Sequence, residues 1–576
     1  MDRFAIALVL EEIGSLLELA GENRFKARAF TAAARALEKT DADVAELARG
    51  QRLQEIPGIG PATARVIADL VATGQSRYYA ELRQRTPSGL RELLNVPGLG
   101  AQKIQQLHAA LGIENTRDLE AAVASGRVAA VRGFGAKTQE RIGRGLAFAR
   151  SSVGRRRLAQ VLGSAARVHG HIAALAEVLR AEVAGEVRRR LEVVSALEIV
   201  TAAEPALCDV VLDAFRALPG TRRSDLERGA EACVQLADGL LLRLWCVPRD
   251  AFATRLLFAT GSDTHLELLA ERALACGLRL APDGLFRGDV RVATAEERDV
   301  YDALDLQFVP PELREDGTEV GMAADHALEP LLELTDLQGC FHCHTTASDG
   351  TASVAEMAEA ALARGWRYLG IADHSPAAYY AGGLSHEAIA RQLEEIDAWN
   401  RRRGQELWLF KGIEADILPD GAVDLSATGL LARFDYVVAS VHSQFRMSRE
   451  QMTARVLRAL DDPHVTMLGH ATGRLLLHRD GYALDLDAVI ERAVERGVLI
   501  EINADPHRLD LDWRNWPKAR ASGVRTAINP DAHSTRGLDA VEYGVYMARK
   551  GGLTSGDVLN AWPLERVRDH FAARRS

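Results

Sequence analysis

Residues 339–345 read GCFHCHT, an apolar, strand-like run that ends in His342 and His344. Further apolar runs end in histidine or carboxylate in the same way: YLGIADHS, LFKGIEAD, VVASVHS, MLGHATGR and INPDAHS. Together with the SDG segment they supply the candidate metal ligands His342, His344, Asp349, His374, Glu414, His442, His470, Asp531 and His533. Imidazole and carboxylate groups suit ions such as Mn²⁺ and Zn²⁺, and so many groups exceed the needs of one ion. The pattern predicts a hydrolytic site with two or three divalent ions.

The order of these runs also predicts the fold around them. The strand-like residues 368–373 precede an amphipathic segment from Glu387 to Asn400, and the strand-like residues 407–416 follow it. Alternation of this kind is typical of an α/β barrel. A single histidine after a strand is usually structural, but in such barrels the carboxyl ends of the strands meet at one mouth. We therefore expect the candidate ligands to converge.

The composition is that of a protein with several domains. The 576 residues are 47% hydrophobic and 26% charged, and this length allows three or more cores. No long uncharged apolar run occurs, and the N-terminal FAIALVL is followed by Glu11 and Glu12. We therefore expect no membrane contact and a cytoplasmic location. The 6 cysteines form no disulfide framework, which fits a reducing compartment.

Charge is unevenly distributed along the chain. Lys and Arg number 21 against 17 Asp and Glu in residues 1–150, and 49 against 63 in residues 151–576, so the net charges are +4 and −14. The positive net charge of residues 1–150 favours binding of a polyanion, and the negative net charge of residues 151–576 favours binding of cations.

Three similar segments recur in the basic part: LQEIPGIGPATARVI, ELLNVPGLGAQKIQQL and VAAVRGFGAKTQERI. Each has a helix-like lead, a tight Gly-x-Gly turn and a second helix. The glycines let backbone amides at the second helix approach a phosphate without reading a base. The series resembles the helix-hairpin-helix motif and predicts sequence-independent DNA binding. The candidate DNA-binding residues are Gly58, Gly60, Gly98, Gly100, Lys103, Gly133, Gly135 and Lys137, with Arg141 as a further phosphate partner.

The whole chain resembles a bacterial family X DNA polymerase with a C-terminal PHP (polymerase and histidinol phosphatase) domain. NRFKARAFTAAARAL is similar to the N-terminal domain of that family, residues 258–286 and 301–315 are similar to its palm and thumb, and the candidate ligands match its PHP motifs. The resemblance implies a multidomain fold with α-helical helix-hairpin-helix domains, an α/β nucleotidyltransferase-like palm and thumb, and a distorted (β/α)7 PHP barrel. The expected boundaries are 1–80 for a small helical domain, 81–150 for a fingers-like helix-hairpin-helix domain, 151–250 for the palm, 251–315 for the thumb, 316–335 for a linker and 336–576 for the barrel.

The palm departs from the family's pattern where nucleotide and metal should bind. Glu186 replaces a serine, Ala196 and Glu198 replace paired aspartates on one strand, and Arg243 replaces a third aspartate on a neighbouring strand. Two-metal nucleotidyl transfer needs carboxylates for both ions. We therefore expect Glu198 and Arg243 to form an ion pair and the palm to be inactive as a polymerase. Nearby acids that do not repeat the alternate-position geometry are Asp209, Asp213 and Asp238.

The resemblance also implies how the barrel residues are shared. The implied metal subsites are His342, His344, Glu414 and Asp531; Asp349, His374 and His533; and Glu414, His442 and His470. Arg474 and Arg508 follow strand ends, and each would hold a substrate phosphate or form a structural ion pair.

The implied activity is that of a metal-dependent DNA phosphodiesterase that works from 3′ ends in DNA repair. Action at abasic sites or on 3′-phosphates is a further option, Mn²⁺ is the expected ion with Zn²⁺ as an alternative, and the expected partner is damaged, gapped or 3′-ended DNA. We expect a monomer in the cytoplasm, at the nucleoid, and the sequence indicates no protein partner. The alternatives are an active repair polymerase with exonuclease, a small-molecule phosphatase of the histidinol phosphate type, and a non-catalytic DNA-binding scaffold.

Overall fold

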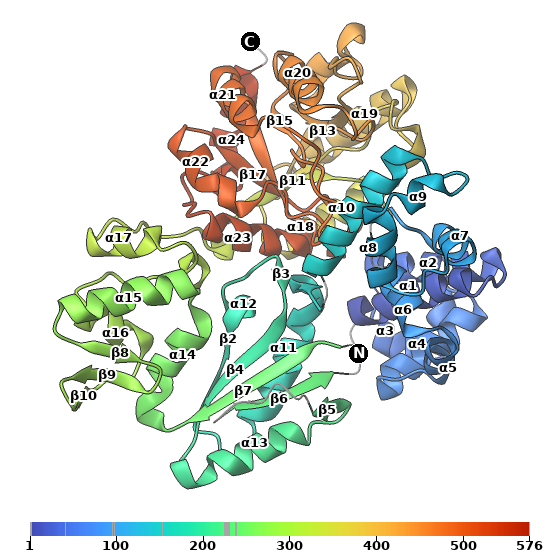
Figure 1. Ribbon diagram of the computed structural model, residues 1–576. Helices are drawn as coiled ribbons and strands as arrows, with labels where there is room; N and C mark the ends of the chain where they lie inside the picture. The colour runs from blue at the N-terminus through green and yellow to red at the C-terminus, as the bar shows by residue number, and fades with distance from the viewer. Residues whose placement is uncertain are drawn as a thin grey trace. The chain divides into compact units, whose positions relative to one another are not determined.

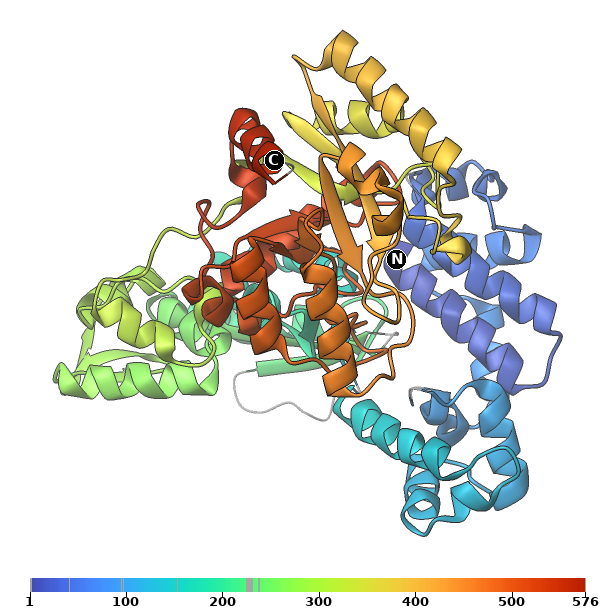
Figure 2. The same ribbon diagram turned by 90° about the horizontal axis from the view of Figure 1, so that it is seen from above.

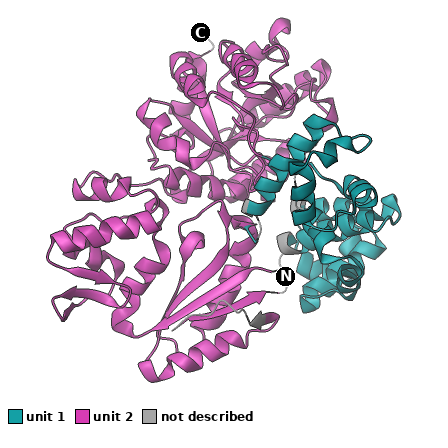
Figure 3. Cartoon of the chain, in the orientation of Figure 1, with its two compact units in different colours: residues 1–155, 477–479 teal, residues 156–476, 480–576 magenta. Residues whose placement is uncertain are grey.

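The computed structural model describes residues 3–574 apart from 41, 95, 97, 153, 224–230, 237 and 238. The chain divides into two compact units, residues 1–155 with 477–479 and residues 156–476 with 480–576 (Figure 3). Within the described residues, no helix combines the length and the apolarity needed to cross a membrane. The 6 cysteines, all inside the described part, are free.

The first unit is helical and has two hydrophobic cores. Ile13, Phe30 and Ile67 are buried in one core, and Leu119 and Phe134 are buried in the other. The helical N-terminal part expected from the sequence is therefore confirmed. Its helices are α1 (Arg3–Leu19), α2 (Arg24–Lys39), α3 (Val44–Arg49), α4 (Pro61–Thr73), α5 (Arg77–Arg85), α6 (Ser88–Leu94), α7 (Ala101–Leu111), α8 (Thr116–Ala124), α9 (Arg127–Ala130) and α10 (Ala136–Ser152).

The second unit begins with the palm, a mixed five-stranded sheet in the order β2-β4-β7-β6-β5 (Figure 1). Strands β4 and β7 are parallel, and the other neighbours are antiparallel. Val161 and Phe215 from two helices share a core with Leu197 and Leu244 from the sheet. The elements are β1 (Arg156–Arg157), α11 (Leu158–Ala173), β2 (Arg180–Ala184), α12 (Gly185–Arg188), β3 (Val193–Val194), β4 (Ala196–Ala202), α13 (Cys208–Arg216), β5 (Thr221–Arg223), β6 (Glu231–Leu236) and β7 (Leu241–Val247).

The thumb follows, with a three-stranded antiparallel sheet and four helices. Its elements are α14 (Phe252–Thr260), α15 (Asp263–Ala275), β8 (Arg279–Ala281), β9 (Gly284–Arg287), β10 (Val290–Val292), α16 (Glu297–Ala303) and α17 (Thr318–Ala324). Helix α17 lies in residues 316–335, which we expected to be a linker. Its Val320 and Ala323 are buried in the same core as Leu269 and Tyr301, so the helix packs as part of the thumb.

The C-terminal part is a barrel of seven parallel strands in sequence order, β11 to β17. A backbone bridge between Cys343 and Ala532 joins the first strand to the segment after the last one. Figure 2 shows this yellow-to-red part from above, with helices outside the strands. The expected distorted (β/α)7 barrel is confirmed. Its elements are β11 (Gly339–Cys343), α18 (Val354–Ala363), β12 (Tyr368–Ile371), α19 (His386–Arg403), β13 (Trp408–Asp416), β14 (Tyr436–Ser440), α20 (Arg449–Leu460), β15 (Met467–Leu468), α21 (Leu486–Arg496), β16 (Leu499–Asn503), α22 (Trp516–Ala521), β17 (Thr526–Asn529), α23 (Val541–Lys550) and α24 (Leu564–Ala573).

The inside of the barrel is filled by aromatic side chains at the start of the strands. The ring of Phe341 lies 5.3 Å from that of Tyr436 and 5.4 Å from that of Phe571 on α24, measured between ring centroids. Successive side chains of a strand point to opposite faces, so Tyr436 and His442, an even number of residues apart, belong to the same inward column. Because these aromatic side chains fill the start of the strands, the inward-facing positions at the carboxyl ends of the strands are left for polar groups.

Strand β11 has an irregularity that matters for the site. Its pairing with β12 slips by one residue between Cys340 and Cys343, and His342, between them, has a positive φ of 56°. A bulge of this kind turns a side chain away from the face that strict alternation would give it. His342 therefore points inward, where its side chain is fully buried.

Candidate functional site

Glu414, on β13, lies at the centre of the candidate metal site. Its Oε1 lies 3.1 Å from Nε2 of His470, 3.2 Å from Nε2 of His442 and 3.3 Å from Nε2 of His342. Its Oε2 lies 2.8 Å from Nδ1 of His374 and 3.8 Å from Nε2 of His344. A carboxylate with imidazole nitrogens around both oxygens is suited to bridge two cations.

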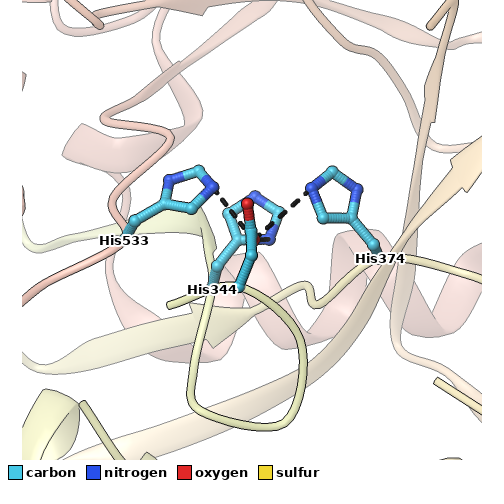
Figure 4. Close-up of side chains that lie close together, drawn as sticks. His344, His374 and His533 are labelled. Atoms are coloured by element: carbon cyan, nitrogen blue, oxygen red, sulfur yellow. Dashed lines mark ion pairs between the residues drawn. The ribbon is translucent and has the colours of Figure 1, made fainter. Parts of the chain in front are cut away.

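Two aspartates complete the cluster. Asp531 Oδ1 lies 3.2 Å from Nε2 of His344, and Asp349 Oδ1 lies 3.2 Å from Nε2 of His533 and 3.7 Å from Nε2 of His374. In Figure 4, His344, His374 and His533 point toward one another, and dashed lines mark ion pairs of the residues drawn. All three histidines form ion pairs with Asp349. The structure thus brings all of the candidate ligands together at the carboxyl end of the barrel.

Three overlapping groups have ligand atoms close enough to share an ion. They are His344, Asp349, His374 and His533; His342, His344 and Glu414; and His374, Glu414 and His442, with the ligand atoms of each group within 4.8 Å of one another. These groups overlap the subsites implied by the sequence, with four differences. His374 also joins Glu414, His344 also joins Asp349, and Asp531 and His470 are in none of the three groups.

Unpaired polar atoms show that the cluster fits a cation. Nε2 of His342, both ring nitrogens of His344 and Nδ1 of His374 are buried and have no hydrogen-bond partner among the described residues. The same holds for Oδ1 of Asp349. Buried polar groups in proteins are normally paired. Buried imidazole and carboxylate atoms left without a partner around a shared space are the donor set that divalent ions take.

The electrostatics of the cluster keep its carboxylates ionised. Burial raises the pKa of Glu414, but the charges of His442, His342 and His374 outweigh it and hold this pKa well below its usual range. Burial also raises the pKa of Asp349, but the neighbouring His533 outweighs it and brings that pKa to about 2. These carboxylates are therefore ionised at neutral pH and can act as ligands to a metal ion.

Two carboxylates that the sequence reasoning did not identify support the histidines. Glu501, on β16, lies 2.6 Å from Nδ1 of His342 and accepts a hydrogen bond from the backbone of His470. Asp416, at the end of β13, lies 2.7 Å from Nδ1 of His442. A carboxylate that holds the Nδ1 proton turns Nε2 toward a metal and increases its basicity. The sequence could have indicated them, because each is an even number of residues from side chains of the same strand that point into the barrel.

The two candidate phosphate-binding arginines differ in their surroundings. Arg474 pairs with Asp512 and donates to the backbone carbonyls of Arg508 and Leu509. It thus holds the loop that carries Arg508. The Nε of Arg508 lies 3.8 Å from Oδ2 of Asp531, so Arg508 is next to the cluster.

The three Gly-x-Gly turns have one geometry. The first glycine of each, Gly58, Gly98 or Gly133, has a φ between 80° and 93°, a region that disfavours side chains. The second glycine precedes the second helix, and a Cβ added there would meet nothing within 4 Å. The N-termini of α4, α7 and α10 are therefore open on that side. Their second glycines are Gly60, Gly100 and Gly135.

The basic side chains near these turns have separate roles. Lys137 is exposed on α10, whereas Lys103 donates a 2.9 Å hydrogen bond to the carbonyl oxygen of Gly98 in its own turn. Arg141 lies against Gly98, because a Cβ at that glycine would come within 3.2 Å of its Nε.

Comparison with known proteins agrees with this architecture. Residues 1–76 match the model of a helix-hairpin-helix domain, residues 90–146 a SAM-like helix-hairpin-helix tandem, residues 255–315 the DNA polymerase beta thumb and residues 341–505 the PHP domain. The chain is 35% identical over 575 residues to the DNA polymerase/3′-5′ exonuclease PolX of Bacillus subtilis, covering 98% of this chain and 99% of the relative. The chain belongs to the family X DNA polymerases with a PHP domain.

The barrel also has relatives of its own. A probable phosphatase of Caldanaerobacter subterraneus is 28% identical over 251 residues, which cover 41% of this chain and 91% of the relative. A probable phosphatase of Thermoanaerobacter sp. is 29% identical over 245 residues, covering 41% of this chain and 94% of the relative. PHP domains are metal-dependent, and the grouped His, Asp and Glu side chains could bind metal.

The palm residues Glu198 and Arg243 lie on neighbouring strands. Glu198 and Arg243 are paired in the register of β4 and β7, and Glu198 Oε1 accepts a 2.9 Å hydrogen bond from Nη1 of Arg243. The ion pair expected from the sequence is present. Glu186 accepts hydrogen bonds from the backbone and hydroxyl of Ser195, and Ala196 offers no ligand atom.

These residues border a cavity of about 420 Å³. Its charged side chains are Glu186, Glu198 and Asp263 with Arg189, Arg243 and Arg255. Asp209 and Asp213 are exposed on α13, and Asp238 lies outside the described residues. Groups of both charges thus line the cavity, and its arginines disfavour the binding of a metal ion.

Proposed function

We propose that this protein is a divalent-metal-dependent DNA phosphodiesterase that removes nucleotides from 3′ ends, and that its palm does not catalyse nucleotide incorporation. The observation that carries the proposal is Glu414, with imidazoles around both carboxylate oxygens. The hairpins support DNA as the substrate, since they offer three similar open helix N-termini. The name of the Bacillus subtilis relative, a DNA polymerase/3′-5′ exonuclease, supports the reaction.

The proposed ligands would hold two or three ions, with Glu414 shared between them. When bound, such ions lower the pKa of a coordinated water and offset charge on phosphoryl oxygens. Mn²⁺ is the ion we propose, because it accepts mixed imidazole and carboxylate ligands. Zn²⁺ would accept the same ligands.

The protein's own groups would prepare the site for a phosphodiester. Glu501 and Asp416 would keep a proton on Nδ1 of His342 and His442 and so leave Nε2 free. Arg508 would contact a phosphoryl oxygen, because its guanidinium lies beside the cluster. Arg474, bonded to the backbone of Arg508 and Leu509, would keep that loop in place.

The inactive palm follows from the pairing of its charges. Arg243 neutralises Glu198 and is also 3.9 Å from Glu231. Burial raises the pKa of Glu198, although the charge of Arg243 opposes this. A cation would have to displace the guanidinium, and Ala196 supplies no second carboxylate.

End-labelled DNA tests both parts of the proposal. Single-stranded, gapped and abasic DNA would be incubated with Mn²⁺, with or without nucleotides. We expect shortening from the 3′ end and no extension in the presence of nucleotides. His344→Ala and His442→Ala should abolish shortening, whereas His464→Ala, a half-buried histidine of the barrel outside the cluster, should not.

Contrary results separate the parts. Unchanged shortening in both ligand variants would refute the assignment of the nuclease site. Extension that disappears when Arg243 and Glu198 are both replaced by alanine would refute the inactive palm.

A 3′-phosphatase or abasic-site activity of the same cluster is the second candidate. The probable phosphatases related to the barrel favour it, since a monoester and a diester need the same ligands. Comparing release of phosphate from 3′-phosphorylated DNA with release of nucleotides would rank the two activities. A free small monoester as the preferred substrate would instead favour the small-molecule phosphatase.

A further inference from the structure

Two exposed tyrosines lie on the loop between β12 and α19. They belong to the short 3-10 helix η6 (Tyr379–Ala381), and 85% of Tyr379 and 58% of Tyr380 is exposed. Among the described residues, Phe25 is the other large aromatic side chain that is exposed to this degree. Exposed apolar side chains that occur singly need no explanation, but these two are adjacent.

The pair lies beside the candidate metal ligands. The ring centroid of Tyr380 is 6.1 Å from that of His442 and 6.4 Å from that of His374. Tyr379 extends the row, with its centroid 6.0 Å from that of Tyr380 and the rings nearly perpendicular, at 78°. A row of neighbouring aromatic rings therefore extends from the candidate metal ligands to the solvent.

The loop that carries the tyrosines is anchored. Ala377 donates a backbone hydrogen bond to Asp424, and Leu384 donates one to the carbonyl oxygen of His374. Gly383 packs so closely on the loop that an added Cβ would lie 2.0 Å from the carbonyl oxygen of Ser375. The tyrosines are thus presented from a fixed loop and contribute little buried surface to the fold.

The chemistry of the pair fits nucleobases. Bases stack on aromatic side chains with little preference for sequence, because every base has a π-face. The ring of Tyr380 lies beside His442 and His374, so it can contact a base while the phosphate approaches the metals.

We propose that Tyr379 and Tyr380 form a stacking site for the unpaired bases at the 3′ end of the DNA strand that enters the metal centre. The inference rests on the proposed nuclease function and adds a preference to it. Bases in a duplex are already stacked and paired, so only frayed or single-stranded ends can offer their faces. The site thereby selects single-stranded 3′ ends.

The test compares two oligonucleotides that differ only in their bases. One has normal bases at its last three positions, and the other has abasic tetrahydrofuran residues there. For the intact protein we expect a KM for nucleotide release on the order of tenfold lower with the bases present. Tyr379→Leu and Tyr380→Leu should raise that KM and leave the KM of the abasic strand unchanged. Tyr379→Phe and Tyr380→Phe keep the ring and should behave as the original protein, as should Val494→Ala, which changes an exposed apolar residue elsewhere in the barrel.

A second measurement does not depend on catalysis. A 2-aminopurine at the 3′ terminus loses fluorescence when it stacks, so the protein should quench it and both leucine variants should quench it less. Equal activity of the leucine variants on both strands, or an equal loss on both, would overturn the inference. If no strand is cleaved, the nuclease proposal fails, and the quenching comparison still decides whether the tyrosines bind bases.

Discussion

Glu501 shows how one residue outside the ligand set can control it. Its side chain is fully buried on β16, where it faces the Nδ1 of His342 and accepts hydrogen bonds from the backbone of His470 and the amide of Asn529. It therefore orients ligands from two other strands. The loss of such a partner typically lowers metal affinity without removing a ligand.

Glu501→Gln should raise the Mn²⁺ concentration needed for half-maximal nuclease activity by about 10- to 100-fold. Activity at saturating Mn²⁺ should recover, because every ligand remains. A Mn²⁺ titration of the initial rate measures both quantities. Glu319→Gln is the matched control, since Glu319 forms the same kind of buried pair with His265 in the thumb, at 2.6 Å. An unchanged Mn²⁺ requirement in Glu501→Gln would show that the pair is only structural.

At the residue scale, strand ends and residue types were enough to name the candidate ligands. They were not enough for Glu501, because an acid inside the apolar run LIEIN has no strand-end position to mark it. The inward turn of His342 depends on a bulge in β11, and a local sequence pattern does not specify a register slip. Tyr379 and Tyr380 reach the cluster only through a loop whose path is set by distant contacts.

At the scale of elements, Glu297 at the start of α16 joins palm to thumb. It pairs with Arg188 of α12 and with the fully buried Arg314, both at 2.6 Å. Burial raises the pKa of Glu297, but the two arginines outweigh it and bring the pKa to about 2. The folded state therefore favours the ionised carboxylate.

Glu297→Gln should lower the free energy of unfolding by about 3 kcal/mol at neutral pH. Because the folded pKa is depressed, this contribution is complete above the unfolded pKa of about 4.3 and is lost as the pH falls toward 2. Denaturant unfolding at pH 7, 5 and 3 should show the difference between the two proteins shrinking at pH 3. Glu296→Gln is the control, because its pair with Arg180 is more than half exposed on the acid side and should contribute less than about 1 kcal/mol. A difference that does not depend on pH would contradict the assignment to the ionised form.

Element-level patterns in the sequence predicted the barrel and the helical hairpins, and the structure has both. The sequence did not predict helix α17 within the expected linker, because its short apolar spacing becomes informative only when Val320 and Ala323 meet the thumb core. The pairing of Glu198 with Arg243 was predictable, since neighbouring parallel strands place those positions opposite each other.

At the scale of the whole second unit, palm and barrel share a polar joint. Glu192 of the palm accepts hydrogen bonds from Nε1 of Trp513, at 2.9 Å, and from Arg514, at 2.7 Å. The buried Lys550 of α23 donates to the carbonyl oxygen of Arg189 and pairs with Glu315 at 2.6 Å. Burying a charge is costly unless it is paired, so this joint favours one fixed arrangement of palm and barrel.

The joint also reaches the candidate metal centre through one loop. Trp513 and Arg514 follow Asp512, which pairs with Arg474, and Arg474 donates to the backbone of Arg508. The palm therefore helps to hold the arginine beside Asp531. This gives a physical reason why the proposed nuclease would need its palm whether or not the palm incorporates nucleotides.

Glu192→Ala should lower the nuclease kcat several-fold while leaving the Mn²⁺ requirement unchanged, because it loosens the loop of Arg508 and touches no ligand. Glu192→Gln keeps an acceptor for Trp513, so its kcat should lie between those of the original protein and of Glu192→Ala. Rates at saturating Mn²⁺, a Mn²⁺ titration and a thermal unfolding curve together distinguish a loosened loop from an unfolded protein. Glu333→Ala is the control, because it removes an exposed partner of Arg549 on the same barrel without contacting residues 505–515. If Glu192→Ala is as active as the original protein, this joint is dispensable for the reaction. If Glu192→Ala changes the Mn²⁺ requirement, the effect lies at the metal ligands and not at Arg508.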